Sequence, residues 1–177
     1  MVEKLVERIR QKDQRAMSQF YQQYVEELSS VCYRYVPNVD DAKDILQNSF
    51  VTMFTSIPTL DYRGEEAFRS WMKKVVINES LSFLRNRRRL LFVELDSEEA
   101  MNDAEPESEQ ITPEKLHELI RELPDGYRTV VNLYVFEGYS HKQIAELLGI
   151  SESTSGSQLY FAKRLLARQI KELSSDK

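Results

Sequence analysis

The chain has 177 residues with a formal net charge of -5, and 30% of its residues are charged. Its single cysteine, Cys32, excludes an intramolecular disulfide and a metal site built from cysteines. No apolar stretch is long enough to cross a membrane, so we expect a soluble, cytoplasmic protein without membrane insertion. The acidic balance does not exclude a nucleic-acid partner, because such a surface needs only a local basic patch.

Charge is distributed unevenly along the chain. Residues 1–92 carry 15 Lys and Arg against 12 Asp and Glu, whereas residues 93–115 carry one basic residue against nine acidic ones. The net negative charge therefore comes from one short segment. From about residue 91 to 112 the apolar periodicity is also lost, and an acidic segment that cannot bury itself is typical of a flexible linker. The sequence therefore predicts two domains joined by an acidic linker over 91–112.

Apolar residues recur at three- and four-residue spacing, and only five Gly and five Pro interrupt the chain, which predicts an all-α protein. In the N-terminal domain we expect four helices, near residues 2–10, 13–36, 40–56 and 65–89. Pro37 and Pro58 follow the second and third helices, where proline ends a helix. Asp40 and Asp41 open the third helix, where carboxylates suit the positive end of the helix dipole. A cluster of four arginines forms the last turn of the fourth.

The C-terminal domain, residues 113–177, is also predicted to hold four helices. Thr112 and Pro113 begin the first, and "LPDGYR" begins a second that runs to about Gly138. In "SHKQIAELLGISESTSGSQLYFAKRLLARQI", Ser140 and Gln143 have the spacing of a capping box, and Gly149 permits a left-handed turn. Ser151 or Ser153 caps the final helix. The inward residues expected on this helix are Leu159, Ala162, Leu166 and Ile170. A short helix, a glycine turn and a second helix predict a helix-turn-helix motif.

Three segments of the chain resemble a known family. "DDAKDILQNSF" (40–50), "FRSWMKKVVINESLSFLRNRRR" (68–89) and "LPDGYRTVVNLYVFEGYSHKQIAELLGISESTSGSQLYFAKRLL" (123–166) are similar, in order and spacing, to extracytoplasmic-function sigma factors of bacterial RNA polymerase. The resemblance implies a transcription initiation factor that binds core RNA polymerase and directs it to promoter DNA. It implies that the 1–90 domain binds the polymerase clamp and melts a -10 type element, whereas the 113–177 domain contacts a -35 type element.

The resemblance also implies roles for individual residues. The positions that match the polymerase-binding motif are Asp44, Gln47 and Asn48, and their i, i+3, i+4 spacing places them on one helix face. The simpler alternative is that the acidic residues of this helix only solvate its surface. On the fourth helix, phosphate contacts are expected from Lys73, Lys74, Arg85, Arg87 and Arg88, and base contacts from Asn78. The arginines could instead only complement a helix C-terminus.

Two further predictions concern base recognition. The loop "LDYRGEE" (60–66) is expected to help hold an extruded base, whereas Phe68 and Trp71 are expected to pack in the core. In the last helix, where relatives often show Thr-Val-Lys-Ser-Arg, this chain has Thr-Ser-Gly-Ser-Gln over 154–158. We nevertheless expect this helix to contact DNA, with Gly156 allowing close backbone approach. The residues proposed for this contact are Ser153, Thr154, Ser157, Gln158, Lys163 and Arg164.

Two other classes of function bear on the same residues. An enzyme is not expected, because His117 and His141 lie in separate helices without clustered ligands or a nucleophile, and no cofactor or metal site is predicted. His141 is expected to be exposed, and Cys32 to be a core residue. A helix-turn-helix regulator that binds operator DNA without polymerase is the alternative. The family resemblance further implies an anti-sigma partner that holds the protein inactive.

Overall fold

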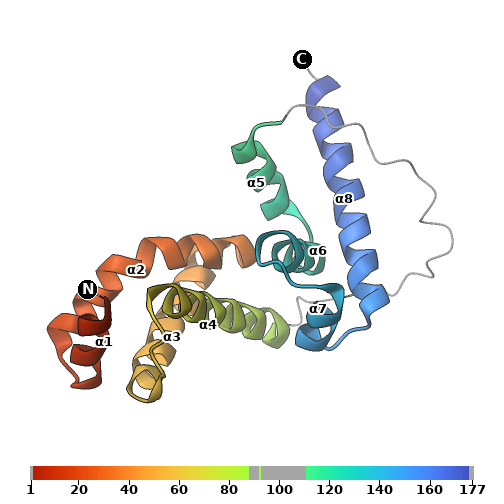
Figure 1. The fold of residues 1–177 in the computed structure, drawn as a ribbon. Coiled ribbons are helices and arrows are strands. Elements are labelled where there is room, and N and C mark those ends of the chain that lie inside the picture. Colours follow the sequence, from red (N-terminus) through yellow and green to blue (C-terminus); the bar gives the residue numbers. More distant parts are fainter. Residues whose placement is uncertain (1, 88–91, 93–110, 176–177) are drawn as a thin grey trace. The chain divides into compact units, whose positions relative to one another are not determined.

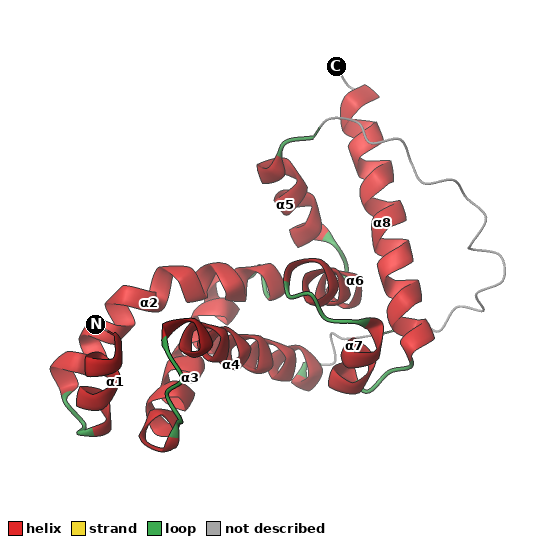
Figure 2. Cartoon of the chain, in the orientation of Figure 1, coloured by secondary structure: helices red, strands yellow, loops and turns green. Residues whose placement is uncertain are grey.

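The computed structural model describes residues 2–87, 92 and 111–175, and every regular element in these ranges is helical (Figure 2). The all-α prediction is therefore confirmed. The chain divides into two compact units, Met1–Arg87 and Arg88–Lys177, and each is described by itself. The predicted linker over 91–112 lies outside the described residues except for Phe92, Ile111 and Thr112, and so does the predicted DNA contact of Arg88.

The first unit contains four α-helices and one 3-10 turn (Figure 1). Local capping explains where two of the helices begin. The Asp13 carboxylate accepts hydrogen bonds from the N–H groups of Arg15 and Ala16, and the Asn38 side chain accepts from Asp40 and Asp41. The elements are α1 (Val2–Arg10), α2 (Gln14–Tyr35), α3 (Val39–Ser56), η1 (Ile57–Thr59) and α4 (Glu65–Asn86).

The core of the first unit is a cluster of aromatic rings around Phe20. The Phe20 side chain is 0% exposed. Its ring centroid lies 5.1 Å from that of Tyr24, 5.5 Å from that of Phe54, and 6.0 Å from those of Phe50 and Phe68. Tilted and edge-on pairs of this kind contribute about 0.5–1.5 kcal/mol each beyond the burial of their area. The cluster therefore ties α2, α3 and α4 together, and α1 packs on α2.

Within residues 111–175 of the second unit, the first helix is capped and one π-helical turn occurs. The Thr112 side chain accepts from the Lys115 N–H, and Pro113 is the first residue of the helix, as predicted. The helix predicted to run to about Gly138 is α-helical only as far as Val131 and then continues as a π turn. In this turn the Glu137 N–H donates to the Asn132 carbonyl at 3.1 Å. The elements are α5 (Pro113–Glu122), α6 (Asp125–Val131), η2 (Asn132–Phe136), α7 (His141–Leu148) and α8 (Glu152–Ser175).

The helix-turn-helix is formed by α7 and α8, which pack against each other. Both halves of the predicted capping box are present between Ser140 and Gln143. Gly149 has φ 69 and ψ 37, which is the left-handed conformation that ends α7 and turns the chain. Ser151 caps α8, because its hydroxyl accepts from the Thr154 N–H at 3.0 Å. Three of the four residues predicted to face inward on α8, Leu159, Ala162 and Leu166, are buried, whereas Ile170 is half-buried.

Candidate polymerase and nucleic-acid interfaces

One face of α3 carries the three residues predicted to bind polymerase. Asp44, Gln47 and Asn48 are all exposed, whereas Ile45 and Leu46 beside them are buried. We call these three residues the α3 face. Val51, one turn further on, is 60% exposed and extends the same stripe with an apolar side chain. Together with Val51, the α3 face offers a charge, two amides and an apolar contact, a mixture that suits a protein partner.

The predicted DNA-facing helix, α4, divides into a buried and an exposed side. Met72, Val76 and Ile77 are buried. Lys74 and Asn78 are exposed on α4, as is Arg85 in its last turn. Lys74 and Asn78 are four residues apart, so they lie on neighbouring turns of the same side. An ammonium group and an amide are thereby both accessible to a polyanionic ligand.

Two of the predicted phosphate contacts are held by acids of the same unit. The Lys73 Nζ lies 3.3 Å from Glu27 Oε1. The Arg87 Nη1 lies 3.1 Å from Asp41 Oδ1, and the Arg87 guanidinium carbon also lies 4.5 Å from the Phe83 ring centroid. Both cations are therefore paired in the free protein. A phosphate would have to compete with Glu27 for Lys73 and with Asp41 for Arg87.

The loop between η1 and α4 is fixed at its first residue. Arg10 donates to the Leu60 carbonyl at 2.5 Å and to the Ile57 carbonyl at 3.4 Å. Beyond Leu60, the Tyr62 ring lies 5.7 Å from that of Phe68. Phe68 is buried, as predicted for a core residue. The Trp71 ring is stacked on Phe68 at 5.4 Å but is only half-buried, so it contributes to the surface as well as to the core.

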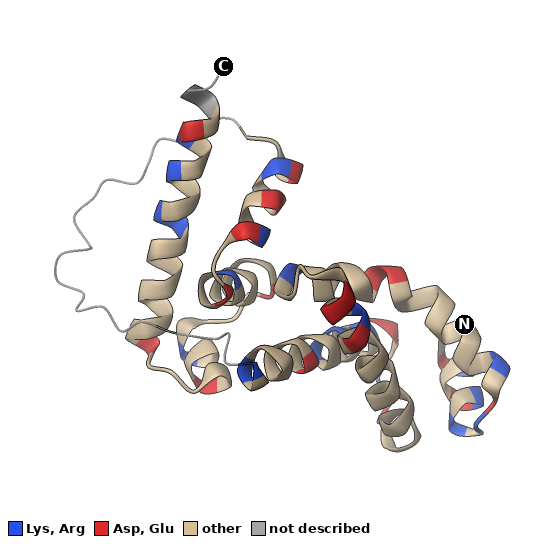
Figure 3. Cartoon of the chain, turned by 180° about the vertical axis from the view of Figure 1, so that it is seen from behind, with Lys and Arg blue, Asp and Glu red and all other residues tan. Residues whose placement is uncertain are grey.

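On α8 the structure corrects the predicted set of DNA contacts. Gln158 is 1% exposed and Thr154 is 4% exposed. Both side chains therefore lie inside the second unit, which contradicts the prediction that they contact DNA. Ser153 remains exposed and Ser157 half-exposed. Lys163 and Arg164, which are both exposed, are the first cations on α8, and Figure 3 shows the uncharged stretch that precedes them.

The buried start of α8 contains a contact that the sequence interpretation missed. The Ser155 side chain is 0% exposed, and its Oγ lies 2.9 Å from His141 Nδ1. The face of the His141 ring stacks on Tyr134, with centroids 4.6 Å apart and an angle of 18° between the rings. His141 is therefore half-buried rather than exposed, and it links α7 to both η2 and α8.

Cys32 is a core residue, as expected. It is 0% exposed, and its Sγ lies 3.8 Å from Ser80 Oγ. Burial raises the pKa of the Cys32 thiol to about 11, with the Ser80 hydrogen bond acting in the opposite direction. The thiol is therefore protonated and unreactive at neutral pH.

Two protein-family models match the chain. The family models "Sigma-70 region 2" and "Sigma-70, region 4" match residues 20–90 and 114–166. The chain is 31% identical over 140 residues to RNA polymerase sigma factor SigV of Bacillus subtilis, covering 79% of this chain and 82% of that protein. It is 29% identical over 182 residues to the ECF RNA polymerase sigma-E factor of Haemophilus influenzae, covering 96% and 95%.

Solved structures share the fold. The chain of CnrH in complex with the cytosolic domain of CnrY has a TM-score of 0.50 and 19% identity, with 95% of this chain and 96% of that chain covered. The sigma factor RpoE in complex with the anti-sigma factor NepR from Bartonella quintana has a TM-score of 0.51 and 17% identity, with 87% and 96% covered.

The chain belongs to the extracytoplasmic-function sigma factors of bacterial RNA polymerase. It is thus a dissociable, non-enzymatic initiation factor that binds core RNA polymerase and directs it to specific promoters. The alternative of an operator-binding regulator that acts without polymerase finds no support in these comparisons. Within residues 2–87 and 111–175, no helix is long and apolar enough to span a membrane.

Proposed function

We propose that the 1–90 domain holds the polymerase through the α3 face. The observation that carries this proposal is the exposure of Asp44, Gln47 and Asn48 on one side of α3, with buried residues between them. Among residues 2–87, the packing of the core does not require these three polar side chains. Their exposure together on one face supports a shared contact with a partner.

Substitution of the α3 face tests this role. We expect Asp44→Ala and Gln47→Ala each to weaken binding to core polymerase about tenfold or more, as expected for central contacts of a protein interface. Gln22→Ala is the matched control, because it removes an exposed amide from α2 and leaves α3 unchanged. The unfolding free energy of each variant should stay within about 0.5 kcal/mol of the original. Unchanged polymerase affinity in both α3 variants would refute the assignment.

We infer that α4 contacts a -10 type element and assists its melting. The exposed side of α4 offers Lys74 and Arg85 for phosphates and Asn78 for base edges, and Arg87 and Arg88 follow at its end. The adjoining loop, residues 60–66, would hold an extruded base. Lys74→Ala is expected to lower the affinity of the holoenzyme for all promoters, whereas Asn78→Ala is expected to alter sequence preference.

We propose that the 113–177 domain contacts a -35 type element through α8. The support is the helix-turn-helix, in which Ser153 and Ser157 remain accessible and Lys163 and Arg164 can neutralise phosphate. The acidic linker over 91–112 would join the two domains, with an extended reach of roughly 70–80 Å and a relaxed span of about 25 Å. Its acids would keep it from binding the DNA that the domains hold.

We also propose a cytoplasmic location and an anti-sigma partner for this chain. The support is that CnrH and RpoE were solved in complex with CnrY and with the anti-sigma factor NepR. Core polymerase would compete with such a partner for the chain, and the partner would release the chain when polymerase binds it. Displacement of a bound inhibitor by purified core enzyme would support this regulation, and an inhibitor that binds the holoenzyme without displacing the chain would contradict it.

A further inference from the structure

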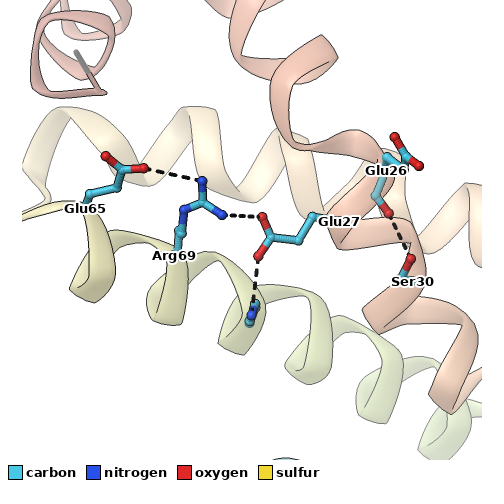
Figure 4. A network of polar contacts seen from close by, with 6 residues as sticks. Glu26, Glu27, Ser30, Glu65 and Arg69 are labelled. Atoms are coloured by element: carbon cyan, nitrogen blue, oxygen red, sulfur yellow. Dashed lines mark hydrogen bonds and ion pairs between the residues drawn. The ribbon is translucent and has the colours of Figure 1, made fainter.

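A single acid of α2 pairs with two cations of α4. Glu27 Oε2 lies 2.9 Å from Arg69 Nη1, and Glu27 Oε1 lies 3.3 Å from Lys73 Nζ. Figure 4 shows the Glu27 carboxylate pointing toward the Arg69 guanidinium. The two cations are four residues apart on α4, so they lie one above the other on the same side of the helix. Each oxygen of the carboxylate is thus taken by a different cation.

This arrangement has the geometry of an anion site. A planar guanidinium beside an ammonium group can hold two oxygens of a phosphate as readily as the two oxygens of a carboxylate. Two groups keep Arg69 in place independently of Glu27: its Nη2 lies 3.3 Å from Glu65 Oε1, and its guanidinium carbon lies 5.6 Å from the Tyr24 ring centroid. The cation would therefore remain oriented if Glu27 moved away.

The site is accessible and the ion pairs in it are replaceable. The side chains of Arg69 and Lys73 are 43% and 41% exposed, and that of Glu27 is 31% exposed. Ion pairs this accessible to solvent are weak, since water and salt screen them. Glu27 and Glu65 together cancel the charge of Arg69 and Lys73, so this part of α4 is neutral in the free protein. A DNA phosphate could take the place of the Glu27 carboxylate.

We propose that Arg69 and Lys73 form a DNA-phosphate site on α4, which Glu27 occupies in the free protein as an internal competitor. The proposal rests on the proposed function, because it requires α4 to face DNA in the holoenzyme. It adds Arg69 to the phosphate contacts and makes Glu27 a residue that limits promoter affinity. Loss of the Glu27 charge then frees two cations without creating a new group.

The test compares holoenzymes on one promoter fragment that has been selected by run-off transcription with the original chain. The variants are Glu27→Gln, Lys73→Ala, Arg69→Gln, and Glu27→Gln combined with each of the other two. Glu26→Gln is the matched control. It removes the same charge from the residue before Glu27, and the Glu26 carboxylate points away from Arg69 (Figure 4). The dissociation constant is measured at several salt concentrations between about 50 and 200 mM, where counterion release dominates.

We expect Glu27→Gln to tighten promoter binding several-fold at low salt and to steepen the slope of log K against log salt by about 0.9 for each additional phosphate that the protein neutralises. Glu26→Gln should do neither. Lys73→Ala and Arg69→Gln should each cost more affinity in the Glu27→Gln background than in the original chain. A partly unfolded variant would lower the active fraction and leave the salt slope unchanged. A changed salt slope therefore distinguishes an altered phosphate contact from partial unfolding.

Two results would overturn the inference. One is an unchanged or shallower salt slope for Glu27→Gln, and the other is an equal cost of Lys73→Ala in both backgrounds. Lys74→Ala, which removes an exposed cation of α4 outside the Glu27 network, separates the two proposals. If Lys74→Ala weakens promoter binding and Glu27→Gln has no effect, only the inference fails. If neither substitution alters binding, α4 does not face DNA and the proposed function of this helix fails with it.

Discussion

Two glycines of the helix-turn-helix should respond in opposite directions to the same substitution. Gly149 ends α7 with φ 69, whereas Gly156 lies inside α8. At both positions an added Cβ would meet no atom within 4 Å. Alanine therefore introduces no clash at either site, and its effect on stability comes from the backbone alone.

The expected magnitudes follow from the two conformations. A residue with a Cβ in the left-handed region costs about 1–2 kcal/mol, so Gly149→Ala should destabilise the second unit by roughly that amount. In a helix interior, glycine is about 1 kcal/mol less favourable than alanine, so Gly156→Ala should stabilise the same unit by about 1 kcal/mol. In a unit of this size, 1 kcal/mol corresponds to a shift in Tm of roughly 4–8 °C. Gly149→Asn should cost less than Gly149→Ala, because asparagine tolerates this conformation.

Hydrogen exchange of the α7 and α8 amides in the full chain measures the change in stability within the second unit, which contains both glycines. A change of 1 kcal/mol alters the protection of these amides about fivefold, downward for Gly149→Ala and upward for Gly156→Ala. Equal effects of the same sign at the two glycines would refute the reasoning. Gly156→Ala also tests whether DNA requires a bare backbone there. If it does, promoter affinity should fall while protection rises.

Three other outcomes are expected. Phe20→Ala should destabilise the first unit by about 3–5 kcal/mol, because the ring is fully buried among four others. Chemical denaturation measures this loss, and a value below about 1 kcal/mol would contradict the packing. Because the folded Cys32 pKa is raised to about 11 from 9.0, the contribution of this thiol to stability should be constant below pH 9 and be lost as pH rises from 9 to 11, and Cys32→Ser should lessen the fall in stability over that range. Ser155→Ala should lower the stability of the second unit by about 1 kcal/mol through loss of the His141 hydrogen bond, whereas Ser153→Ala, at an exposed position, should change it by less than about 0.5 kcal/mol.

The helices could be predicted from the sequence because their signals are local. Caps and prolines act over a few residues, so the predicted ends of the helices near Pro37, Thr112 and Ser140 agree closely with the structure. The capping box and the left-handed Gly149 were predicted for the same reason. The π turn was missed, because π-helical segments are rare and occur mostly as single turns within longer helices.

The contacts of the candidate sites were less predictable. Gln158 was assigned to DNA from its polarity, yet it lies four residues before Ala162, and Ser155 lies four before Leu159. Extension of the inward stripe toward the start of α8 would have placed both inside. No local signal could have indicated that Glu27 pairs with Arg69 and Lys73, because these residues are 42 or more positions apart and meet only when α2 packs on α4.

The most direct measurement compares binding of a labelled promoter fragment by the chain alone and by the chain with core RNA polymerase. Since one domain is proposed to hold the polymerase through the α3 face while α4 and α8 contact DNA, specific binding should require core enzyme. Asp44→Ala should abolish it at concentrations at which Gln22→Ala does not. Specific binding by the chain alone, as tight as that of the holoenzyme, would contradict this account.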